Sequence, residues 1–333
     1  MISIALSDAY AQNAPSTPRI ILDTDMGSDC DDVGALALLN EYANQGKVEI
    51  VGIIYSSGAV PYGVGVIDAI NHYYGNEQIP IGASYDSLFG DPVDKMLAEK
   101  LAKDTSAFHH RFITNTDVPE QTHLLRTLLA NQVDTSIVYV TVGHTKGLYD
   151  LLTSSPDSIS DLSGYELAKT KIKKWVALGA LNADNSEGNY VQDWNFFRNK
   201  TVPFTHYLAS NFPRPTYFVS GGGNVMTGKS LAATPPGNIV RTAYRDWLWN
   251  MEKKTLHDQR PSWDLVTVYF AVEEPTQHFT VRTDGYLQVD LEQGSRWITA
   301  DTTTNHHFVS QYPKSNIELA NYLNQLIAKP LED

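Results

Sequence analysis

The sequence contains a single cysteine among its 333 residues. Cys30 has no second cysteine to pair with, which excludes an intrachain disulfide framework, so the cellular compartment cannot be inferred from disulfide pairing. Cys30 stands between Asp29 and Asp31, among hard oxygen donors. We interpret it as a small neutral spacer and not as a thiolate ligand.

Basic residues and long apolar runs are also scarce. The chain has 25 Lys and Arg against 38 Asp and Glu, a formal net charge of −13, so it lacks the basic stripe that phosphate backbones require. We therefore expect no nucleic-acid partner. No run of about 18 apolar residues occurs, so no membrane span is expected. With 42% hydrophobic residues, the chain is nevertheless long enough to bury a large core.

Residues 1–18 are either a flexible leader or the remnant of an export signal. A short apolar start is followed by the small-x-small site Ala9-Tyr10-Ala11 and by a polar stretch rich in Gln, Asn, Pro, Ser and Thr. A basic leader is missing, and the apolar run is short for a full signal. We favour a periplasmic or secreted location over a cytoplasmic one. No Pro/Gly-rich linker divides the rest, so we assign residues 19–333 to one domain.

Short apolar runs alternate with helix-like segments along the chain. The runs are rich in β-forming residues and end in Gly, Ser or Asp, which predicts buried strands at 19–23, 48–57, 137–143, 174–180 and 216–223. Helices are expected between them at 31–45, 66–75, 145–154 and 200–210, and a closing amphipathic helix at 315–327 capped by Ser315. The alternation predicts an α/β fold with a largely parallel, mixed central sheet and helices on both faces.

Five aspartates crowd the segment that follows the first strand. They lie within "DTDMGSDCDD" and are Asp23, Asp25, Asp29, Asp31 and Asp32. Helix capping explains one or two acidic residues at a helix start, but not five, because neighbouring carboxylates repel one another unless a cation or strong hydrogen bonds compensate. In a parallel sheet, ligands bind outside the carboxyl ends of the strands, where this loop falls. We therefore predict a site for a hard cation such as Ca²⁺ or Mg²⁺.

Four segments in the same order resemble the nucleoside hydrolases, the calcium-dependent N-ribohydrolases that prefer inosine and uridine among other nucleosides. They are "IILDTDMGSDCDDVGALALL" (20–39), "VYVTVGHTKGLYDLL" (138–152), "GNYVQDWNFFRN" (188–199) and "RPSWDLVTVYFAV" (260–272). The resemblance covers the chain from about residue 19 to 272. It implies a Rossmann-like fold, a small-molecule nucleoside as substrate and cleavage of the N-glycosidic bond by water. The resemblance is also compatible with assembly into a homo-oligomer.

Carried over by position, the resemblance implies a calcium site. The ligands would be Asp25, Asp32, Asp264 and the main-chain carbonyl of Val142, with Asp25 also acting as the base that takes a proton from the attacking water. A rival alignment takes His257-Asp258 as the family's His-Asp pair, but we favour Trp263-Asp264 because the helix-like pattern begins at Asp264.

The same resemblance implies a sugar site and a base site. Asp31 would bind the ribose hydroxyls. The other side of the sugar would contact Asp193, Asn195 and Asn189, and Trp194 would form a wall of the sugar site. Trp263 stands where many members have a histidine, as in a purine-specific branch, and we expect it to act in catalysis by stacking on a purine. The chain also departs from the family at Ala59, where an asparagine is usual.

Three other functions stay open on the sequence. An Asp-x-Asp after a strand is also found in haloacid dehalogenase-type phosphohydrolases, although Gly27 stands where those have Thr or Val. The departures at Ala59 and Trp263 are also compatible with a calcium-dependent nucleoside or ribose binder that has lost activity. Finally, residues 223–230 meet the Gly-x4-Gly-Lys-Ser spacing of a phosphate loop, but such short matches arise by chance.

Overall fold

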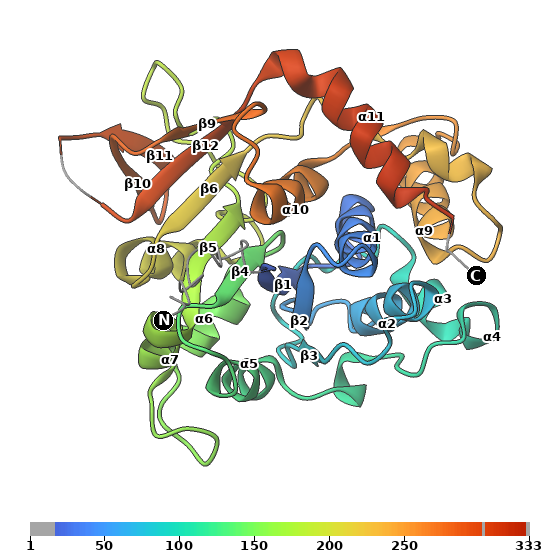
Figure 1. Cartoon of the computed structure of the whole chain (residues 1–333), viewed down its shortest axis with the longest axis horizontal. Coiled ribbons are helices and arrows are strands. Elements are labelled where there is room, and N and C mark those ends of the chain that lie inside the picture. Colours follow the sequence, from blue (N-terminus) through green and yellow to red (C-terminus); the bar gives the residue numbers. More distant parts are fainter. Residues whose placement is uncertain (1–16, 302–303, 331–333) are drawn as a thin grey trace, which may run out of the picture.

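An eight-stranded sheet forms the centre of the molecule (Figure 1). The computed structural model describes residues 17–301 and 304–330, so most of the proposed leader lies outside the described residues. In sheet order the strands are β3 (Ile81–Ala83), β2 (Glu49–Tyr55), β1 (Arg19–Thr24), β4 (Ile137–Thr141), β5 (Ile172–Leu178), β6 (Thr216–Ser220), β12 (His306–Gln311) and β9 (Phe279–Arg282). Neighbours pair in parallel except β9, which runs antiparallel to β12.

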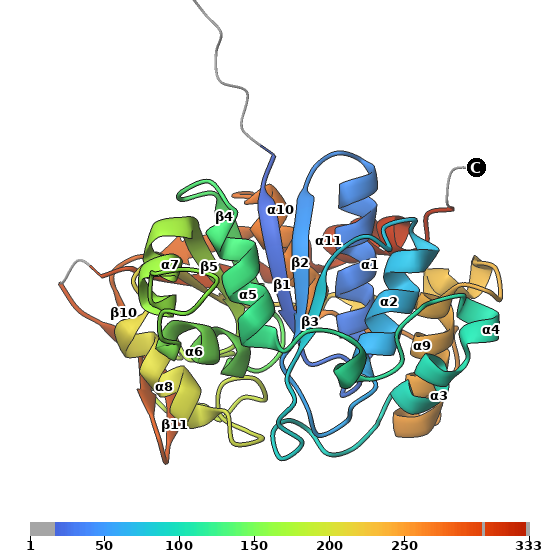
Figure 2. The same cartoon turned by 90° about the horizontal axis from the view of Figure 1, so that it is seen from below.

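Helices cover both faces of this sheet, as the view from below shows (Figure 2). One face carries α1 (Asp31–Asn44), α2 (Gly63–Tyr73), α9 (Ile239–Trp247), α10 (Trp263–Glu273) and α11 (Asn316–Ile327), with α3 (Ala98–Lys103) and α4 (Thr105–Phe108) beside them. The other face carries α5 (Gln121–Ala130), α6 (Lys146–Thr153), α7 (Gly164–Lys171) and α8 (Val202–Asn211). The predicted mixed α/β fold is thereby confirmed.

The apolar run of β1 is continuous because both of its faces are buried. Alternate side chains point to opposite faces of a strand, and Ile20 and Leu22 accordingly belong to the core under α1, whereas Ile21 belongs to the core under α5 and α6. None of the three is exposed to solvent. The same alternation explains why the strand was recognisable as a run of apolar residues and not as an alternating pattern.

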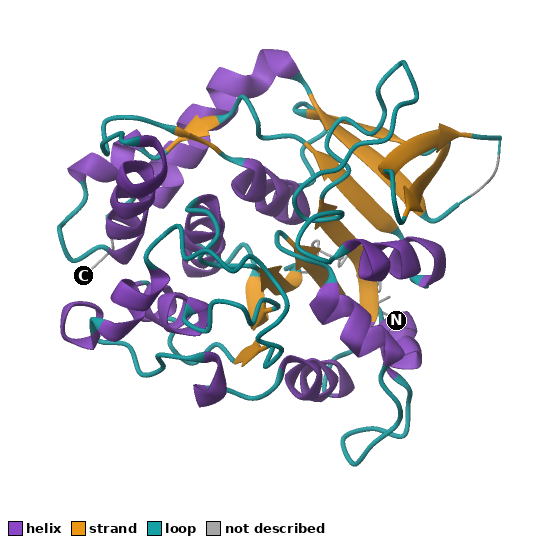
Figure 3. Ribbon diagram, turned by 180° about the vertical axis from the view of Figure 1, so that it is seen from behind, coloured by secondary structure: helices purple, strands orange, loops and turns teal. Residues whose placement is uncertain are grey.

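Smaller elements lie at the edges and were not expected from the sequence (Figure 3). They are the hairpin β10 (Gly285–Asp290) with β11 (Gly294–Thr299), the short pair β7 (Met226–Thr227) with β8 (Arg260–Pro261), a π-helical turn at Leu248–Glu252 and single turns at Asn115–Asp117, Lys229–Ala233 and Pro313–Ser315. The closing helix α11 begins at Asn316, but the Ser315 hydroxyl donates to the Tyr312 carbonyl and makes no side-chain cap. The capping role expected for Ser315 is therefore wrong.

The strand order places a topological switch point between β1 and β4. From β1 the chain builds outward through β2 and β3, then returns to the other side of β1 for β4, β5 and β6. The loops after β1 and β4 therefore diverge to opposite faces of the sheet and leave a crevice at their carboxyl ends. Asp25 and Val142 are the first residues after these two strands.

Gly143 allows the two strand ends to meet. A Cβ atom at this position would lie 2.4 Å from the backbone nitrogen of Asp25 and 2.7 Å from the carbonyl carbon of Thr24. Val142 is tied to the same strand end, because its N–H donates to the Asp23 carbonyl at 2.8 Å. Backbone atoms cannot give way as a flexible side chain can, so this position tolerates only glycine without a shift.

Replacing Gly143 with alanine is expected to lower the free energy of unfolding by about 1–3 kcal/mol, the usual cost of overpacking a tight site. Urea unfolding monitored by circular dichroism measures this change. Gly237→Ala is the matched control, because no atom lies within 4 Å of its added Cβ. Equal stability of the two variants would contradict the close approach of β1 and β4.

Candidate functional site

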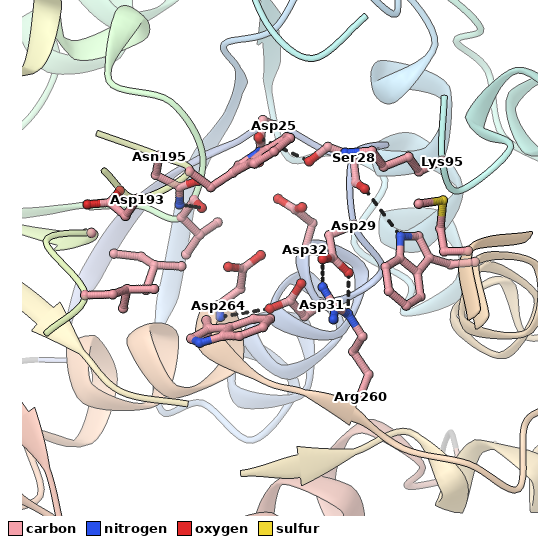
Figure 4. Close-up of a pocket in the computed structure, with 18 residues that line it drawn as sticks. Asp25, Ser28, Asp29, Asp31, Asp32, Lys95, Asp193, Asn195, Arg260 and Asp264 are labelled. Atoms are coloured by element: carbon pink, nitrogen blue, oxygen red, sulfur yellow. Dashed lines mark hydrogen bonds and ion pairs between the residues drawn. The ribbon is translucent and has the colours of Figure 1, made fainter. Parts of the chain in front are cut away.

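A cavity of about 330 Å³ opens at the carboxyl ends of β1, β4 and β5 (Figure 4). It lies at the switch point, and its walls come from segments that are far apart in the sequence. Its lining residues are Asp25, Ser28, Asp29, Asp31, Asp32, Lys95, Val142, Leu178, Gly179, Leu181, Asp193, Trp194, Asn195, Trp247, Met251, Arg260, Trp263 and Asp264. All predicted site residues except Asn189 are among them.

Four carboxylates gather at the inner end of the cavity. Asp25 follows β1, Asp31 and Asp32 form the first turn of α1, and Asp264 lies in the first turn of α10. The two helices pack against each other, and the Asp264 N–H donates to Asp31 Oδ2 at 3.4 Å. Each helix start favours negative charge, which partly offsets the repulsion among these groups.

Burial makes this acidic cluster costly to ionise. All four side chains are at most 5% exposed. Burial is the main cause that raises the pKa of Asp31, Asp32 and Asp264 above the ordinary value, and the negative charge of neighbouring aspartates raises it further. Thr24 donates to Asp32 Oδ1 and partly counteracts this effect. The site would therefore gain from a bound cation.

The donor chemistry fits calcium better than a softer metal. Carboxylate and carbonyl oxygens are the ligands that Ca²⁺ prefers, and Cys30 is buried without lining the cavity. Within residues 17–301 and 304–330, however, no three His, Cys, Asp or Glu side chains are grouped closely enough to hold a metal ion. The carbonyl of Val142 accepts a hydrogen bond from Asn195 Nδ2 at 2.6 Å. The oxygens share one cavity, but they are not closed around one point.

Asp23 lies behind the cavity and not in its wall. Its side chain is not exposed, and Tyr139 Oη donates to Asp23 Oδ2 at 2.7 Å. Burial raises its pKa to about 7. As the first acid of the Asp-x-Asp pattern, it would be the nucleophile of a haloacid dehalogenase-type enzyme, and a residue in this position cannot reach a substrate. The structure thus argues against that alternative.

The loop after β5 supplies the opposite wall. Asp193 and Asn195 line the cavity, and both are already bonded within the protein. The Asp193 carboxylate accepts hydrogen bonds from the N–H groups of Ala180 and Phe196, each at 2.8 Å. Burial raises the pKa of Asp193 to about 6. These two residues organise the loop, and contact with a sugar remains a prediction.

Trp194 and Asn189 belong to the same loop but differ in position. Trp194 lines the cavity, is 38% exposed and has Lys95 Nζ 4.2 Å from its ring centroid. Asn189 does not line the cavity. Its side chain is exposed and donates to Glu187 Oε2 at 2.6 Å. The structure brings Trp194, but not Asn189, to the site.

Aromatic and basic residues form a second part of the cavity wall, which we call the outer half and which consists of Lys95, Trp247, Met251, Arg260 and Trp263. Trp263 begins α10 and Trp247 ends α9, and the guanidinium carbon of Arg260 lies 5.0 Å and 4.0 Å from their ring centroids. Met251 completes this apolar wall from the π-helical turn. Of these residues the sequence analysis identified only Trp263, because the contact depends on how α9 and α10 are placed.

His144 is a further residue that the sequence analysis did not single out. It is completely buried, and its Nε2 lies 3.4 Å from Asp25 Oδ2. Burial lowers its pKa, so the imidazole is neutral at ordinary pH. Its place two residues after Val142, at the end of a buried strand, was the available signal. The imidazole therefore lies beside the Asp25 carboxylate, and its Nε2 is also 3.4 Å from Asn199 Nδ2.

Several other candidates lie away from the cavity. The exposed side chain of His257 and the nearby Asp258 precede β8, and neither lines the cavity, whereas Trp263 and Asp264 do. Ala59 is also outside the lining. Residues 223–230 include β7 and lead into a 3₁₀ turn, so they do not form the strand-loop-helix of a phosphate loop. No helix of the described residues is long and apolar enough to cross a bilayer.

Comparison with known proteins decides the fold. No protein-family model and no curated protein matches the sequence. Among solved structures, a plant nucleoside hydrolase, PpNRh1, is 13% identical with a TM-score of 0.65, and the match covers 94% of this chain and 100% of that one. The chain has a nucleoside hydrolase-like fold.

Two further solved structures are similar in fold to this chain. The inosine-uridine preferring nucleoside hydrolase of Bacillus anthracis is 15% identical, with a TM-score of 0.62 and coverage of 94% of this chain and 100% of the other. The type III effector protein XopQ, solved with adenosine diphosphate ribose, is 12% identical, with a TM-score of 0.65 and coverage of 95% and 94%. At these identities the likeness establishes the fold, and the activity must be argued from the site.

The buried Asp23 predicts a pH-dependent stability difference. Its pKa is raised from 3.8 to about 7, so the stability that its protonated form contributes is present below about pH 4 and is lost as the pH rises to 7. Asp23→Asn keeps an acceptor for Tyr139 but cannot ionise. In chelator-containing buffer, the melting temperature of Asp23→Asn is expected to rise relative to wild type between pH 5 and pH 8.

The buried histidines do not obscure this comparison. His306, whose pKa burial lowers to about 4, changes stability in the opposite direction but is present in both proteins, so its effect cancels in the difference. A constant difference between the two melting temperatures across this range would show that Asp23 does not titrate.

Proposed function

We propose that the protein hydrolyses the N-glycosidic bond of ribonucleosides, preferably purine nucleosides, with the help of calcium. The observation that carries this proposal is the meeting of Asp25, Asp31, Asp32 and Asp264 in one buried cavity at the switch point of a nucleoside hydrolase-like fold. Such a cavity suits a reaction in which positive charge develops on a sugar.

The Asp25 carboxylate is suited to act as the general base. It is 5% exposed, and its Oδ2 receives a hydrogen bond from the Ser28 hydroxyl at 3.2 Å and lies 3.4 Å from His144 Nε2. These contacts hold one oxygen in place, while the carboxylate faces the cavity. A water molecule placed against it would lose a proton to Asp25 as its oxygen attacks the anomeric carbon.

The surrounding carboxylates would stabilise the sugar in the transition state. As the C1′–N bond breaks, the ribosyl group becomes oxocarbenium-like, and fixed negative charges in a dry cavity act on it more strongly than they would in water. Asp31 is the ribose-binding candidate, because the hydrogen bond that it accepts from the Asp264 N–H is long and leaves it available to hydroxyl groups.

Calcium would be held by Asp25, Asp32, Asp264 and the Val142 carbonyl. When bound, it would neutralise the acidic cluster and hold water and the sugar hydroxyls in line. Val142 can contribute because a carbonyl oxygen has a second lone pair beyond the one that Asn195 uses. Attack of water on the anomeric carbon from the face opposite the nucleobase implies inversion of configuration without a covalent intermediate.

A nucleoside or ribose binder without turnover is the second candidate. The adenosine diphosphate ribose complex of XopQ shows that the same fold can be found with a bound ligand of this kind. The basic residues Lys95 and Arg260 at the outer half of the cavity also favour a polar ligand. This candidate differs from the hydrolase in predicting binding without release of ribose.

A panel of nucleosides incubated with the full chain in calcium, read by release of reducing sugar, tests the proposal. Release of ribose that depends on calcium supports the hydrolase. Calorimetric binding of a nucleoside without release supports the binder, and neither binding nor release would reject both.

Calcium dependence is expected to disappear in Asp32→Ala. Calcium at 100 times Kd should stabilise the folded wild type by about 2.7 kcal/mol, which is measured as an increase in melting temperature. The variant should lose this increase and should lose ribose release as well. In chelator it should be at least as stable as wild type, because a buried carboxylate with neighbours of the same charge is removed. Asp161→Ala removes an exposed acid and serves as the control. Wild-type calcium stabilisation in Asp32→Ala would remove Asp32 from the ligand set.

Purine preference is expected to depend on Trp263. Offset stacking is worth about 0.5–1.5 kcal/mol beyond burial, which corresponds to roughly a 2- to 10-fold effect, and a purine offers the larger ring. Wild type should therefore show a higher kcat/KM for inosine than for uridine, and Trp263→Ala should reduce that ratio. Trp249→Ala removes an exposed tryptophan outside the cavity lining and should leave the ratio unchanged. A native preference for uridine would contradict the stacking role.

A further inference from the structure

Arg260 is held in one orientation at the outer half of the cavity (Figure 4). Its Nε donates to Asp29 Oδ1 at 2.8 Å, and its Nη2 pairs with Asp29 Oδ2. The guanidinium also lies over the rings of Trp247 and Trp263, and the side chain is only 11% exposed. One carboxylate thus fixes an edge of the guanidinium while two indoles fix its plane.

The opposite edge of this guanidinium remains available. A guanidinium has five N–H donors, and the contact with one carboxylate engages its Nε and Nη2 side. No hydrogen bond within the described residues uses Nη1. Burying an arginine this far lowers its pKa to about 10, so the group still keeps its charge at neutral pH. A fixed charged donor therefore borders the cavity.

The rest of the outer half offers no comparable group. Lys95 also lines the cavity, but its Nζ is paired with Asp91 at 2.5 Å and lies over Trp194. No histidine or tyrosine is present among the described residues that line the cavity. His144 is buried beside Asp25, at the acidic end. A departing base at the outer half would therefore meet apolar surfaces and Arg260, and not a neutral acid with an ordinary pKa near 7.

We propose that Arg260 stabilises the leaving base, by donating a hydrogen bond from Nη1 to an acceptor atom of that base. This inference rests on the proposed hydrolysis and names the group that assists departure. As the C1′–N bond breaks, its electron pair passes to the base, which becomes anionic. Water supplies the hydroxyl that C1′ gains, Asp25 takes the proton, and the anionic base takes a proton from solvent after it has left.

The arrangement also predicts which bases benefit. A guanidinium can donate but cannot accept, so it favours a carbonyl oxygen or an unprotonated ring nitrogen over an amino group. Bases with a carbonyl group next to the ring nitrogens, such as the 6-oxopurines of inosine and guanosine, therefore fit better than adenine. Asp29 acts as a positioning residue, because its carboxylate holds the guanidinium through Nε and Nη2.

Two substrates with different leaving groups test this role. Inosine needs stabilisation of its departing base, whereas 4-nitrophenyl β-D-ribofuranoside releases a good leaving group that needs none. Arg260→Met is expected to reduce kcat/KM for inosine by about 10²- to 10³-fold, the usual effect of removing a preorganised donor, and for the nitrophenyl riboside by less than about 3-fold. Arg296→Met is the matched control, since Arg296 stacks on Tyr190 outside the cavity.

The outcomes separate this inference from the function on which it rests. If wild type cleaves both substrates and Arg260→Met slows both equally, Arg260 is not the leaving-group residue although the hydrolase stands. If wild type cleaves neither, both proposals fail. If the melting curve shows that Arg260→Met does not fold, Arg260→Lys replaces it. A lysine ammonium lacks the planar guanidinium that can contact Asp29 with one edge and the nucleobase with the other. The same split between the two substrates is then required, and an equal loss would again reject the role.

Discussion

Repulsion among Asp25, Asp31, Asp32 and Asp264 is the constraint on which the site depends. Bringing four carboxylates into a cavity where each is at most 5% exposed destabilises the fold unless something compensates. The starts of α1 and α10 supply part of that compensation, because unpaired N–H groups and the helix dipoles favour negative charge. The hydrogen bond that Thr24 donates to Asp32 supplies a further part, and the proposed calcium would supply the rest.

The close packing beneath these groups explains why they stay together. Glycine at position 143 lets the ends of β1 and β4 touch, and Asp23, buried behind Asp25, is bonded to Tyr139 of β4. The α1–α10 contact then brings Asp264 next to Asp31 although the two are 233 residues apart in the sequence. The site is thus a consequence of the sheet order and of one helix pair.

The sequence predicted the parts of this arrangement that depend on local pattern. The buried strands, the helix after the acidic loop and a helix from Asp264 follow from apolar runs and periodicity, and α10 begins one residue earlier than expected, at Trp263. The residues that sequence reasoning missed, including His144, Trp247 and Arg260, reach the cavity only through tertiary packing. Trp247 ends one helix and Arg260 lies in a two-residue strand, and neither position carries a local signal. Asn189 shows the reverse, because its motif is present but its loop directs it to Glu187.

The cavity presents both carboxylates and a fixed guanidinium, and this combination suits the movement of charge in glycoside cleavage. Heterolysis leaves positive charge on the ribosyl group and negative charge on the base, so a site helps most when it presents carboxylates to the first and a donor to the second. Asp25, Asp31, Asp32 and Asp264 supply the carboxylates, and Arg260, between two tryptophans, supplies the donor. Arg260 also acts on the carboxylates, because its positive charge lowers the pKa of Asp264. Its ion pair with Asp29 and its contacts with the two indoles therefore fix the position from which the guanidinium can act on a leaving group.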